Sequence, residues 1–201
     1  MSLLQRTIDL QKLLLNFYHL ERTMLLPDVE GGISRNETDT EHSYSLAMAA
    51  WYIAQEFPHL DTNKCIRYAL VHDLHEIYAG DTFIYDPSEE VLATKAAREE
   101  AAIERMAREW PDFSEMNEYL EGYERREDPE SRFVYALDKI MPMILNHLSG
   151  GRNYRAHGIT LEDVKQAKAD KVAVSPEIQQ LYKELIAIFE ARPDYFEKKK
   201  K

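Results

Sequence analysis

The sequence is poor in cysteine and in long apolar runs, and each shortage excludes a class of protein. Its 201 residues include one cysteine, Cys65, so no disulfide can form within the chain. A single cysteine suits a reducing cytoplasm. No apolar run approaches the roughly 18 residues that a membrane-spanning helix needs. The N-terminal segment is interrupted by Arg6, Asp9 and Lys12, so we expect neither a signal peptide nor a membrane anchor.

Positive charge is also scarce. Lysine and arginine number 25 against 36 aspartates and glutamates, which leaves a net charge of −11. A chain this acidic repels nucleic-acid polymers, so we expect no such partner. Only the run Lys198–Lys201 is strongly basic, and we predict a frayed, solvated tail over about 197–201. The hydrophobic fraction of 44% is typical of a globular protein, and the length fits a single domain over 1–201.

Helix signals dominate the chain, and the sequence shows no convincing run of alternating strand character. Loops are predicted over 27–39, which contains Gly31 and Gly32, and over 81–87. The fold class is therefore all-α. Caps, prolines and apolar spacing place the helices at about 2–20, 40–57, 63–78, 88–110, 114–123 and 129–148, with two more that begin near 160 and 176.

Polar side chains accompany the apolar face of the predicted helix 63–78. At 100° per residue, its core-facing stripe consists of Ile66, Leu70, Leu74 and Ile77. Asp73 falls beside that stripe, and His72 and Glu76 continue the same flank. His75 falls on roughly the opposite side, so we predict an exposed polar residue there. The helix thus presents a histidine and two carboxylates at the edge of the core.

Two more polar residues point inward from other helices. His42 lies near the start of helix 40–57, with apolar residues following at helical spacing; such a lone histidine is more often a satisfied core residue than a ligand. Asp138 shares its face with Val134, Met141 and Leu145. Burying this carboxylate costs several kcal/mol unless it is paired or bound to a metal. A buried salt bridge is therefore the alternative to a metal site at Asp138.

Two inward histidines and two inward aspartates form a mixed nitrogen and oxygen set. Such a set suits one divalent transition metal, Mn²⁺, Fe²⁺, Co²⁺, Ni²⁺ or Zn²⁺, and suits Mg²⁺ less well. Four protein ligands on a six-coordinate ion leave room for a water and a substrate oxygen. The sequence therefore predicts a metal site that could accept a phosphate.

These residues resemble a known family. The T-E-H at 40–42, the H-D pair at 72–73 and the L-D-K at 137–139 resemble the HD-domain phosphohydrolase superfamily. R-N-E-T-D-T-E-H at 35–42 and H-D-L-H-E-I-Y-A-G-D at 72–81 are similar to its branch of 5′-deoxynucleotidases. The resemblance covers about 10–148. It implies an all-α HD-domain helical bundle with its metal-site core there and C-terminal helices over 160–192.

The resemblance also implies roles for individual residues. One divalent metal would be held by His42, His72, Asp73 and Asp138. Glu76 would orient or deprotonate the attacking water, although it could instead only support a ligand imidazole. Asp81 would lie near the sugar, and Arg22 would grip the phosphate. Apart from the resemblance, the expected phosphate chemistry would use Lys139 or Arg35 to neutralise phosphate charge. For Arg35, an ion pair to Glu37 or Glu41 is an equal alternative.

Two departures bear on the substrate. The bacterial members of the branch place a tryptophan directly after the phosphate-gripping arginine, where this chain has Thr23. In the guanosine-tetraphosphate hydrolase branch an aspartate follows the catalytic glutamate, whereas Ile77 follows Glu76 here, and this disfavours that activity. The implied function is release of phosphate from (deoxy)nucleoside 5′-monophosphates by a homodimer. The alternatives are cleavage of a cyclic nucleotide or other phosphodiester, and a metal-binding scaffold without turnover.

Overall fold

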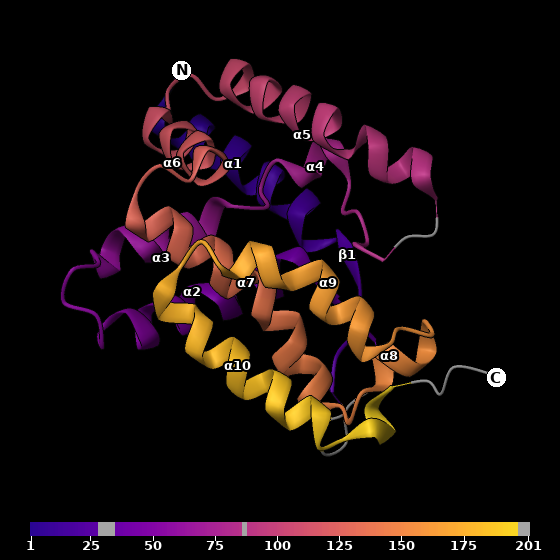
Figure 1. Cartoon of the computed structure of the whole chain (residues 1–201). Coiled ribbons are helices and arrows are strands. Elements are labelled where there is room, and N and C mark those ends of the chain that lie inside the picture. Colours follow the sequence, from indigo (N-terminus) through magenta and orange to yellow (C-terminus); the bar gives the residue numbers. More distant parts are fainter. Residues whose placement is uncertain (28–34, 86–87, 197–201) are drawn as a thin grey trace.

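Helix α7 (Pro129–Leu148) lies at the centre of the computed structural model, which describes residues 1–27, 35–85 and 88–196 (Figure 1). Asp128 caps its start by accepting a 2.8 Å hydrogen bond from the Ser131 amide, and Pro129 takes the first helical position. The predicted bounds of this helix are confirmed. Its fully buried side chains include Phe133, Val134, Leu137, Ile140 and Met143.

Helices α2 (Asp39–Ala54) and α3 (Thr62–Val71) pack against each other and against α7. A capping box opens α2: the Thr38 hydroxyl accepts from the Glu41 amide, and the Glu41 carboxylate accepts from the Thr38 amide. Asp61 caps α3. This packing turns the beginning of α2 and the end of α3 toward the same face of α7, where the predicted metal ligands lie.

The prediction of one helix over 63–78 is wrong. Helix α3 ends at Val71, and α4 (Glu76–Ala79) begins after four residues of hydrogen-bonded turn. In this turn the Leu74 amide bonds to the Val71 carbonyl and the Glu76 amide to the Asp73 carbonyl, a three-residue spacing that tightens the chain. Because this turn is tighter than an α-helix, the side chains after Val71 no longer follow the spacing of 100° per residue. His75 is consequently buried, at 2% exposure, whereas Leu70 of the predicted core stripe is 49% exposed.

The expectation of no strands is also wrong. Strands β1 (Glu21–Leu25) and β2 (Asn36–Thr38) form an antiparallel pair in which Glu21 faces Thr38 and Leu25 faces Asn36. Segments of five and three residues are too short to show a clear alternation in the sequence. The predicted Gly31–Gly32 loop and the tail at 197–201 lie outside the described residues.

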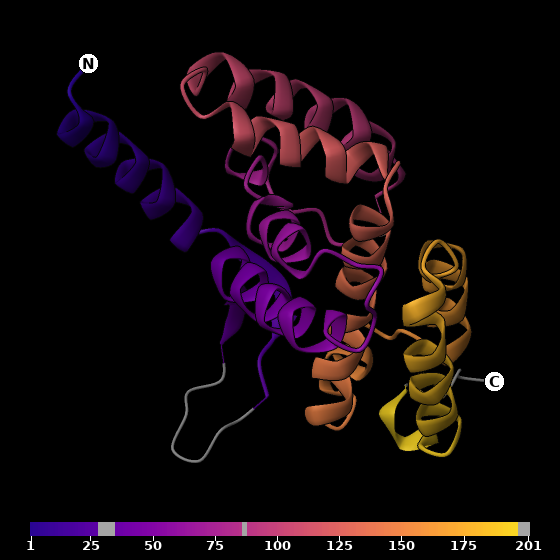
Figure 2. The same cartoon turned by 90° about the vertical axis from the view of Figure 1, so that its left-hand side faces the viewer.

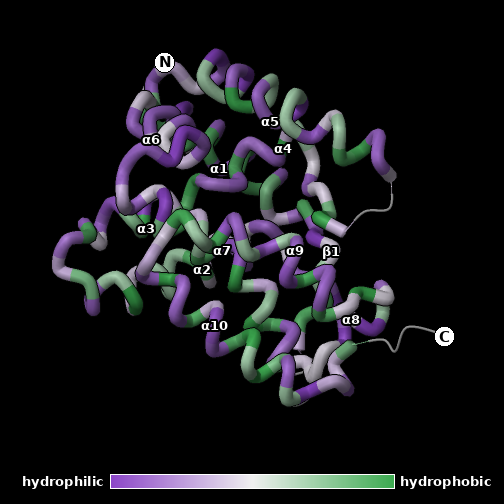
Figure 3. The backbone as a smooth tube through the Cα atoms, in the orientation of Figure 1, coloured by the Kyte–Doolittle hydropathy of each residue, from purple (hydrophilic) through white to green (hydrophobic). Residues whose placement is uncertain are grey.

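The remaining elements surround this centre, with α1 at one edge and the α9–α10 pair at the other (Figure 2). Apart from the helix predicted over 63–78, the predicted helices are present, whereas α8 was not predicted. Hydrophobic and hydrophilic residues alternate along α5 and α10, as expected for amphipathic surface helices (Figure 3). The bounds are α1 (Leu3–Tyr18), α5 (Glu89–Glu109), α6 (Ser114–Arg125), α8 (Arg152–Ala156), α9 (Leu161–Val172), α10 (Pro176–Glu190) and the 3₁₀ turn η1 (Pro193–Tyr195).

The C-terminal helices share the core of α7. Val164 and Val172 of α9 and Ile178 and Phe189 of α10 are buried in the same apolar cluster as the α7 side chains. A smaller cluster joins α1 to α4, α5 and α6. The all-α fold class is confirmed. Within the described ranges, no helix is both long and apolar enough to cross a membrane.

Candidate active site

The four predicted ligands come together from three segments of the chain. His42 Nε2 lies 2.9 Å from Asp138 Oδ1, and His72 Nε2 lies 2.9 Å from Asp73 Oδ2 and 3.9 Å from Asp138 Oδ1. The two imidazole centroids are 5.3 Å apart. Ligand atoms of His42, His72 and Asp73 all lie within 4.8 Å of one another. Both imidazoles are fully buried. Because nitrogen and oxygen donors lie this close together, the set could hold a divalent metal.

The orientation of His72 fits a metal ligand. Its Nδ1 lies 2.9 Å from the Ala69 carbonyl, which can only accept a hydrogen bond, so Nδ1 carries the proton. Nε2 faces the carboxylates of Asp73 and Asp138 but forms no well-aligned hydrogen bond with the described residues. Burial acts to lower the pKa of His72, but the charges of Asp73 and Asp138 outweigh it and raise that pKa. Carboxylate oxygens this close to an imidazole nitrogen favour a cation at that nitrogen, either a proton or a metal ion. A carbonyl that fixes the tautomer is the usual support of a metal-bound histidine.

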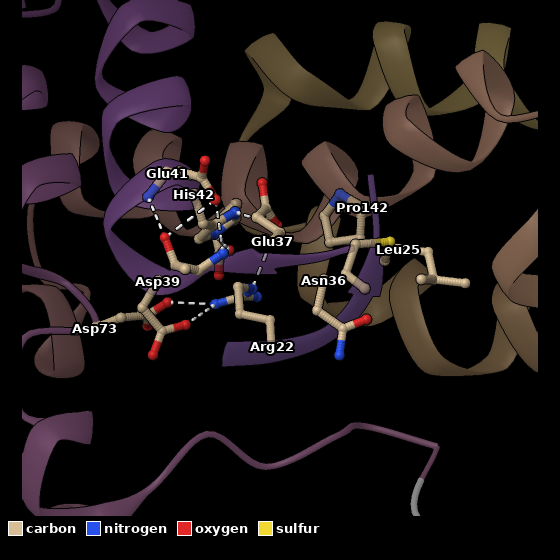
Figure 4. A network of polar contacts seen from close by, with 12 residues as sticks. Arg22, Leu25, Asn36, Glu37, Asp39, Glu41, His42, Asp73 and Pro142 are labelled. Carbon is tan, nitrogen blue, oxygen red and sulfur yellow. Dashed lines mark hydrogen bonds and ion pairs between the residues drawn. The ribbon is translucent and has the colours of Figure 1, made fainter. Parts of the chain in front are cut away.

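His42 is held in the neutral form. Burial, together with the nearby Arg22 charge, lowers the pKa of His42 to about 4. The neutral imidazole is the form that binds a metal. Its Nδ1 lies 3.7 Å from Glu37 Oε2, and Figure 4 shows Glu37 between His42 and Arg22. Burial raises the pKa of Glu37 to about 7.

Asp138 is paired as well as placed for a metal. Burial opposes its ionisation, but Lys139 at 2.5 Å and His42 hold the pKa of the Asp138 carboxyl well below its usual range. The Tyr123 hydroxyl donates a 3.1 Å hydrogen bond to Asp138 Oδ2. The buried salt bridge considered as the alternative for Asp138 is therefore present. It leaves Oδ1 directed at the two histidines, so the pair and the metal site are compatible.

Arg22 lies at the centre of an acidic group. From β1, its guanidinium contacts Asp73 at 2.9 Å, Asp39 at 3.1 Å and Glu37 at 3.5 Å (Figure 4). It also lines the cavity beside the ligands, where a phosphate could reach it. Arg35 behaves differently. It pairs with Glu41 and is absent from the described cavity lining, as the ion-pair alternative predicts.

A second group of carboxylates lies beside the histidines. Oxygens of Asp39, Glu76 and Asp81 lie within 4.8 Å of one another. Burial, and then the charges of Asp73, Asp81 and Asp39, raise the pKa of Glu76 well above its ordinary value. Burial likewise raises the pKa of Asp39, to about 7, and that of Asp81. Their oxygens are the type of ligand that a hard cation prefers.

Both groups open into a cavity of about 340 Å³, the lower end of the range for small-ligand sites. It is lined by the predicted Arg22, Asp73, Glu76, Asp81, Asp138 and Lys139. It is also lined by residues that the sequence interpretation missed: His75, Lys95, Lys168 and Lys171. A signal for one of these was available, since Lys168 lies midway between Val164 and Val172 on the apolar stripe of α9.

Comparison with known proteins agrees with this geometry. The HD domain family matches residues 27–180, which is more than half of the sequence. The chain belongs to the HD domain family. The match begins before β2 and ends within α10, so this HD domain includes the C-terminal helices as well as the histidines and aspartates described above.

Named relatives of this HD-domain protein include enzymes. It is 34% identical to 5′-deoxynucleotidase HDDC2 of Bos taurus over 159 residues, which cover 77% of this chain and 73% of that one. The Homo sapiens 5′-deoxynucleotidase HDDC2 is also 34% identical, with 77% and 74% covered. A crystal structure from Magnetospirillum magnetotacticum MS-1, named "predicted metal-dependent phosphohydrolase", is 27% identical, with a TM-score of 0.77 and 96% of each chain covered.

Proposed function

We propose that this HD-domain protein is a metal-dependent phosphomonoesterase that releases phosphate from (deoxy)nucleoside 5′-monophosphates. The observation that carries the proposal is the position of His72 Nε2, which faces the carboxylates of Asp73 and Asp138 at the wall of a cavity that Glu76 and Arg22 also line. The relatives named as 5′-deoxynucleotidases support the substrate class. The proposed ligands are His42, His72, Asp73 and Asp138, for Mn²⁺, Co²⁺, Ni²⁺, Fe²⁺ or Zn²⁺ in preference to Mg²⁺.

A divalent ion held by these four residues would supply Lewis-acid polarisation of the phosphate and would lower the pKa of a water. Arg22 holds the phosphate, because its guanidinium lies at the cavity beside Asp73. Glu76 orients the attacking water and accepts its proton at Oε2, which has no hydrogen-bond partner among the described residues. Burial and the neighbouring carboxylates raise the pKa of Glu76, which makes its carboxylate a stronger base toward that water. Asp81 contacts the sugar.

Two alternatives to this function can be distinguished by experiment: a phosphodiesterase and a metal-binding scaffold without turnover. The same ion and water could cleave a phosphodiester, because attack on phosphorus needs the same groups. A scaffold without turnover would also keep the metal. A buried carboxylate such as Glu76 argues against the scaffold, since it costs stability and forms no ion pair in the described structure.

The test is phosphate release from a panel of nucleoside and deoxynucleoside 5′-monophosphates, supplied with Mn²⁺, Co²⁺, Ni²⁺ or Mg²⁺. We expect turnover with the transition metals and its loss on treatment with a chelator, restored by adding the metal back. A 2′,3′-cyclic nucleotide and a dinucleotide serve as controls. Turnover of the cyclic nucleotide or the dinucleotide alone would contradict the proposal and identify the protein as a phosphodiesterase. A protein that binds stoichiometric metal but turns over none of these substrates would be a metal-binding scaffold.

We further propose that the protein is a cytoplasmic homodimer. Cys65 is a free, fully buried thiol, which suits a reducing compartment. Large apolar side chains are exposed along one stripe of α2 and along α1, which extends away from the rest of the molecule (Figure 2). Such a surface favours association with a second copy. The stripe on α2 consists of Tyr44, Met48, Trp51 and Tyr52, and α1 adds Leu4, Ile8 and Leu15.

A further inference from the structure

Helix α9 places an unusual lysine in the wall of the cavity. Lys168 is only 5% exposed, and no hydrogen bond or ion pair to it is found in the described part of the chain. An ammonium group in this position has little contact with bulk water and no acid partner, which disfavours its charged form. Lys171, one helical turn further along and on the same face, is half-buried, lines the same cavity and lacks an acid partner there too.

The other cations of the cavity each have an acid partner. Arg22 pairs with Asp73, Lys139 with Asp138, Lys95 with Glu99 and Arg126 with Glu124. Among the described cavity-lining cations, the two lysines of α9 therefore differ in having no acid within ion-pair distance. Burial, followed by the charges of Lys139 and Lys171, lowers the pKa of Lys168 to about 7. This direction agrees with a crowded cationic surface that lacks its counter-ion.

The charges of the cavity as a whole match one dianion. Its lining holds six cationic side chains and six carboxylates, which cancel. A divalent metal on the histidines and aspartates would add two positive charges. A phosphate monoester carries up to two negative charges at neutral pH. Because the lining is balanced when the α9 lysines are included, the two positive charges of the metal would be neutralised by one phosphate group.

We propose that Lys168, assisted by Lys171, binds the phosphate group of the substrate, so that the C-terminal helix pair completes the substrate site. The inference rests on the proposed function and extends it by assigning binding residues outside the segment that carries the metal ligands. Lys168 holds the phosphate from α9 while Arg22 holds it from β1. The two elements lie far apart in sequence but line the same cavity.

The proposal is tested with Lys168→Met, which keeps the length of the side chain and removes its charge. In the manganese-loaded protein, we expect binding of inorganic phosphate to weaken about tenfold or more, the effect of losing a hydrogen bond to a charged group. KM for the nucleotide should rise by a similar factor, with a smaller change in kcat. Thermal stability should stay equal or increase, because a buried, unpaired charge is removed. Lys168→Arg should restore part of the phosphate affinity.

The matched control is Lys165→Met on the same helix. Lys165 pairs with Glu190 at 2.7 Å and is not one of the cavity-lining residues. This variant should bind phosphate as the wild type does. Unchanged phosphate affinity and KM in a folded, metal-loaded Lys168→Met protein would overturn the inference, as would an equal loss in the control. If the wild type binds phosphate and Lys168→Met does not, but no nucleotide is hydrolysed, the proposed function fails while the phosphate site stands.

Discussion

Buried acids are concentrated around a single arginine. Glu37, Asp39 and Asp73 all lie within 3.5 Å of the Arg22 guanidinium, and Glu76 lies close to Asp39 and Asp81. One positive charge cannot balance this group, and the pKa values of Glu37, Asp39 and Glu76 are raised as a result of burial and mutual repulsion. Among these three acids, Glu76 lines the cavity, and a strongly raised carboxyl pKa in a cavity is typical of a catalytic site.

Glu76 provides the sharpest test at the scale of single residues. Glu76→Gln keeps the size of the side chain and removes its ability to accept a proton. We expect phosphate release to fall by about 10²-fold or more, the usual effect of losing a general base. Metal content should remain that of the wild type, since the four proposed ligands are retained. Both are measured on one preparation, by elemental analysis and by phosphate assay.

The control for this substitution is Glu118→Gln on the exposed face of α6, which should change neither quantity. Wild-type turnover in the Glu76 variant would remove Glu76 from the mechanism. Loss of metal would instead make it a ligand or a support of one.

At the scale of elements, the start of α7 depends on Asp128. Its carboxylate accepts from the Ser131 amide at 2.8 Å and from the Tyr68 hydroxyl at 2.6 Å, and it pairs with Lys64 at 3.0 Å. Asp128→Ala should lower the free energy of unfolding by about 1–2 kcal/mol, the cost of losing a helix cap. Asp128→Asn, which keeps an acceptor oxygen, should lose less. Urea unfolding measures both, and equal losses would show that the ion pair rather than the cap matters.

The stabilisation that Asp128 contributes should depend on pH. Burial acts to raise its pKa, but the contacts with Tyr68, Ser131 and Lys64 outweigh it and bring the pKa of Asp128 to about 2. A depressed folded-state pKa means that the stabilisation is fully present above the ordinary value near 4 and is lost as the pH falls toward 2. The difference in unfolding free energy between wild type and Asp128→Ala should therefore shrink over that range.

The junction between α7 and α8 allows a second test at this scale. Gly151 has a φ of +77°, and a Cβ there would overlap the backbone of Tyr195 in η1. Gly150 also has a positive φ, of +62°, but a Cβ would meet nothing within 4 Å. Gly150→Ala should cost about 1–2 kcal/mol from backbone strain alone. Gly151→Ala should cost clearly more and displace η1. Equal costs by urea unfolding would contradict the close packing of η1 on this turn.

For the whole molecule, the proposed dimer depends on the apolar surface of α1 and α2. Trp51 is 51% exposed in the stripe on α2. Trp51→Glu would place a charge at the centre of that surface, and we expect sedimentation velocity to show a single-chain species where the wild type forms a two-chain one. Glu56→Gln near the end of α2 is the control and should sediment as the wild type. A wild-type protein that sediments as one chain would exclude the dimer.

The sequence by itself determined the helical class and most helix bounds, and it predicted the four proposed ligands. These features depend on local physics: a cap such as Asp128, a proline at a first helical position, or an aspartate such as Asp138 on an apolar face is visible in a few adjacent residues. The positions of His42 and Asp138 were predictable because a regular helix carries its phase along the chain.

Only the tertiary structure decided what depends on irregular backbone or on distant segments. The break after Val71 changes the helical phase, so His75 is buried and Leu70 exposed, contrary to the 100° pattern. The short β1–β2 pair places Arg22 against Asp73, a partner 51 residues away. Lys168 enters the cavity because α9 packs on α7. Contacts between distant segments depend on the packing of whole elements. A local pattern can therefore place Lys168 on the buried face of α9 but cannot show which cavity that face lines.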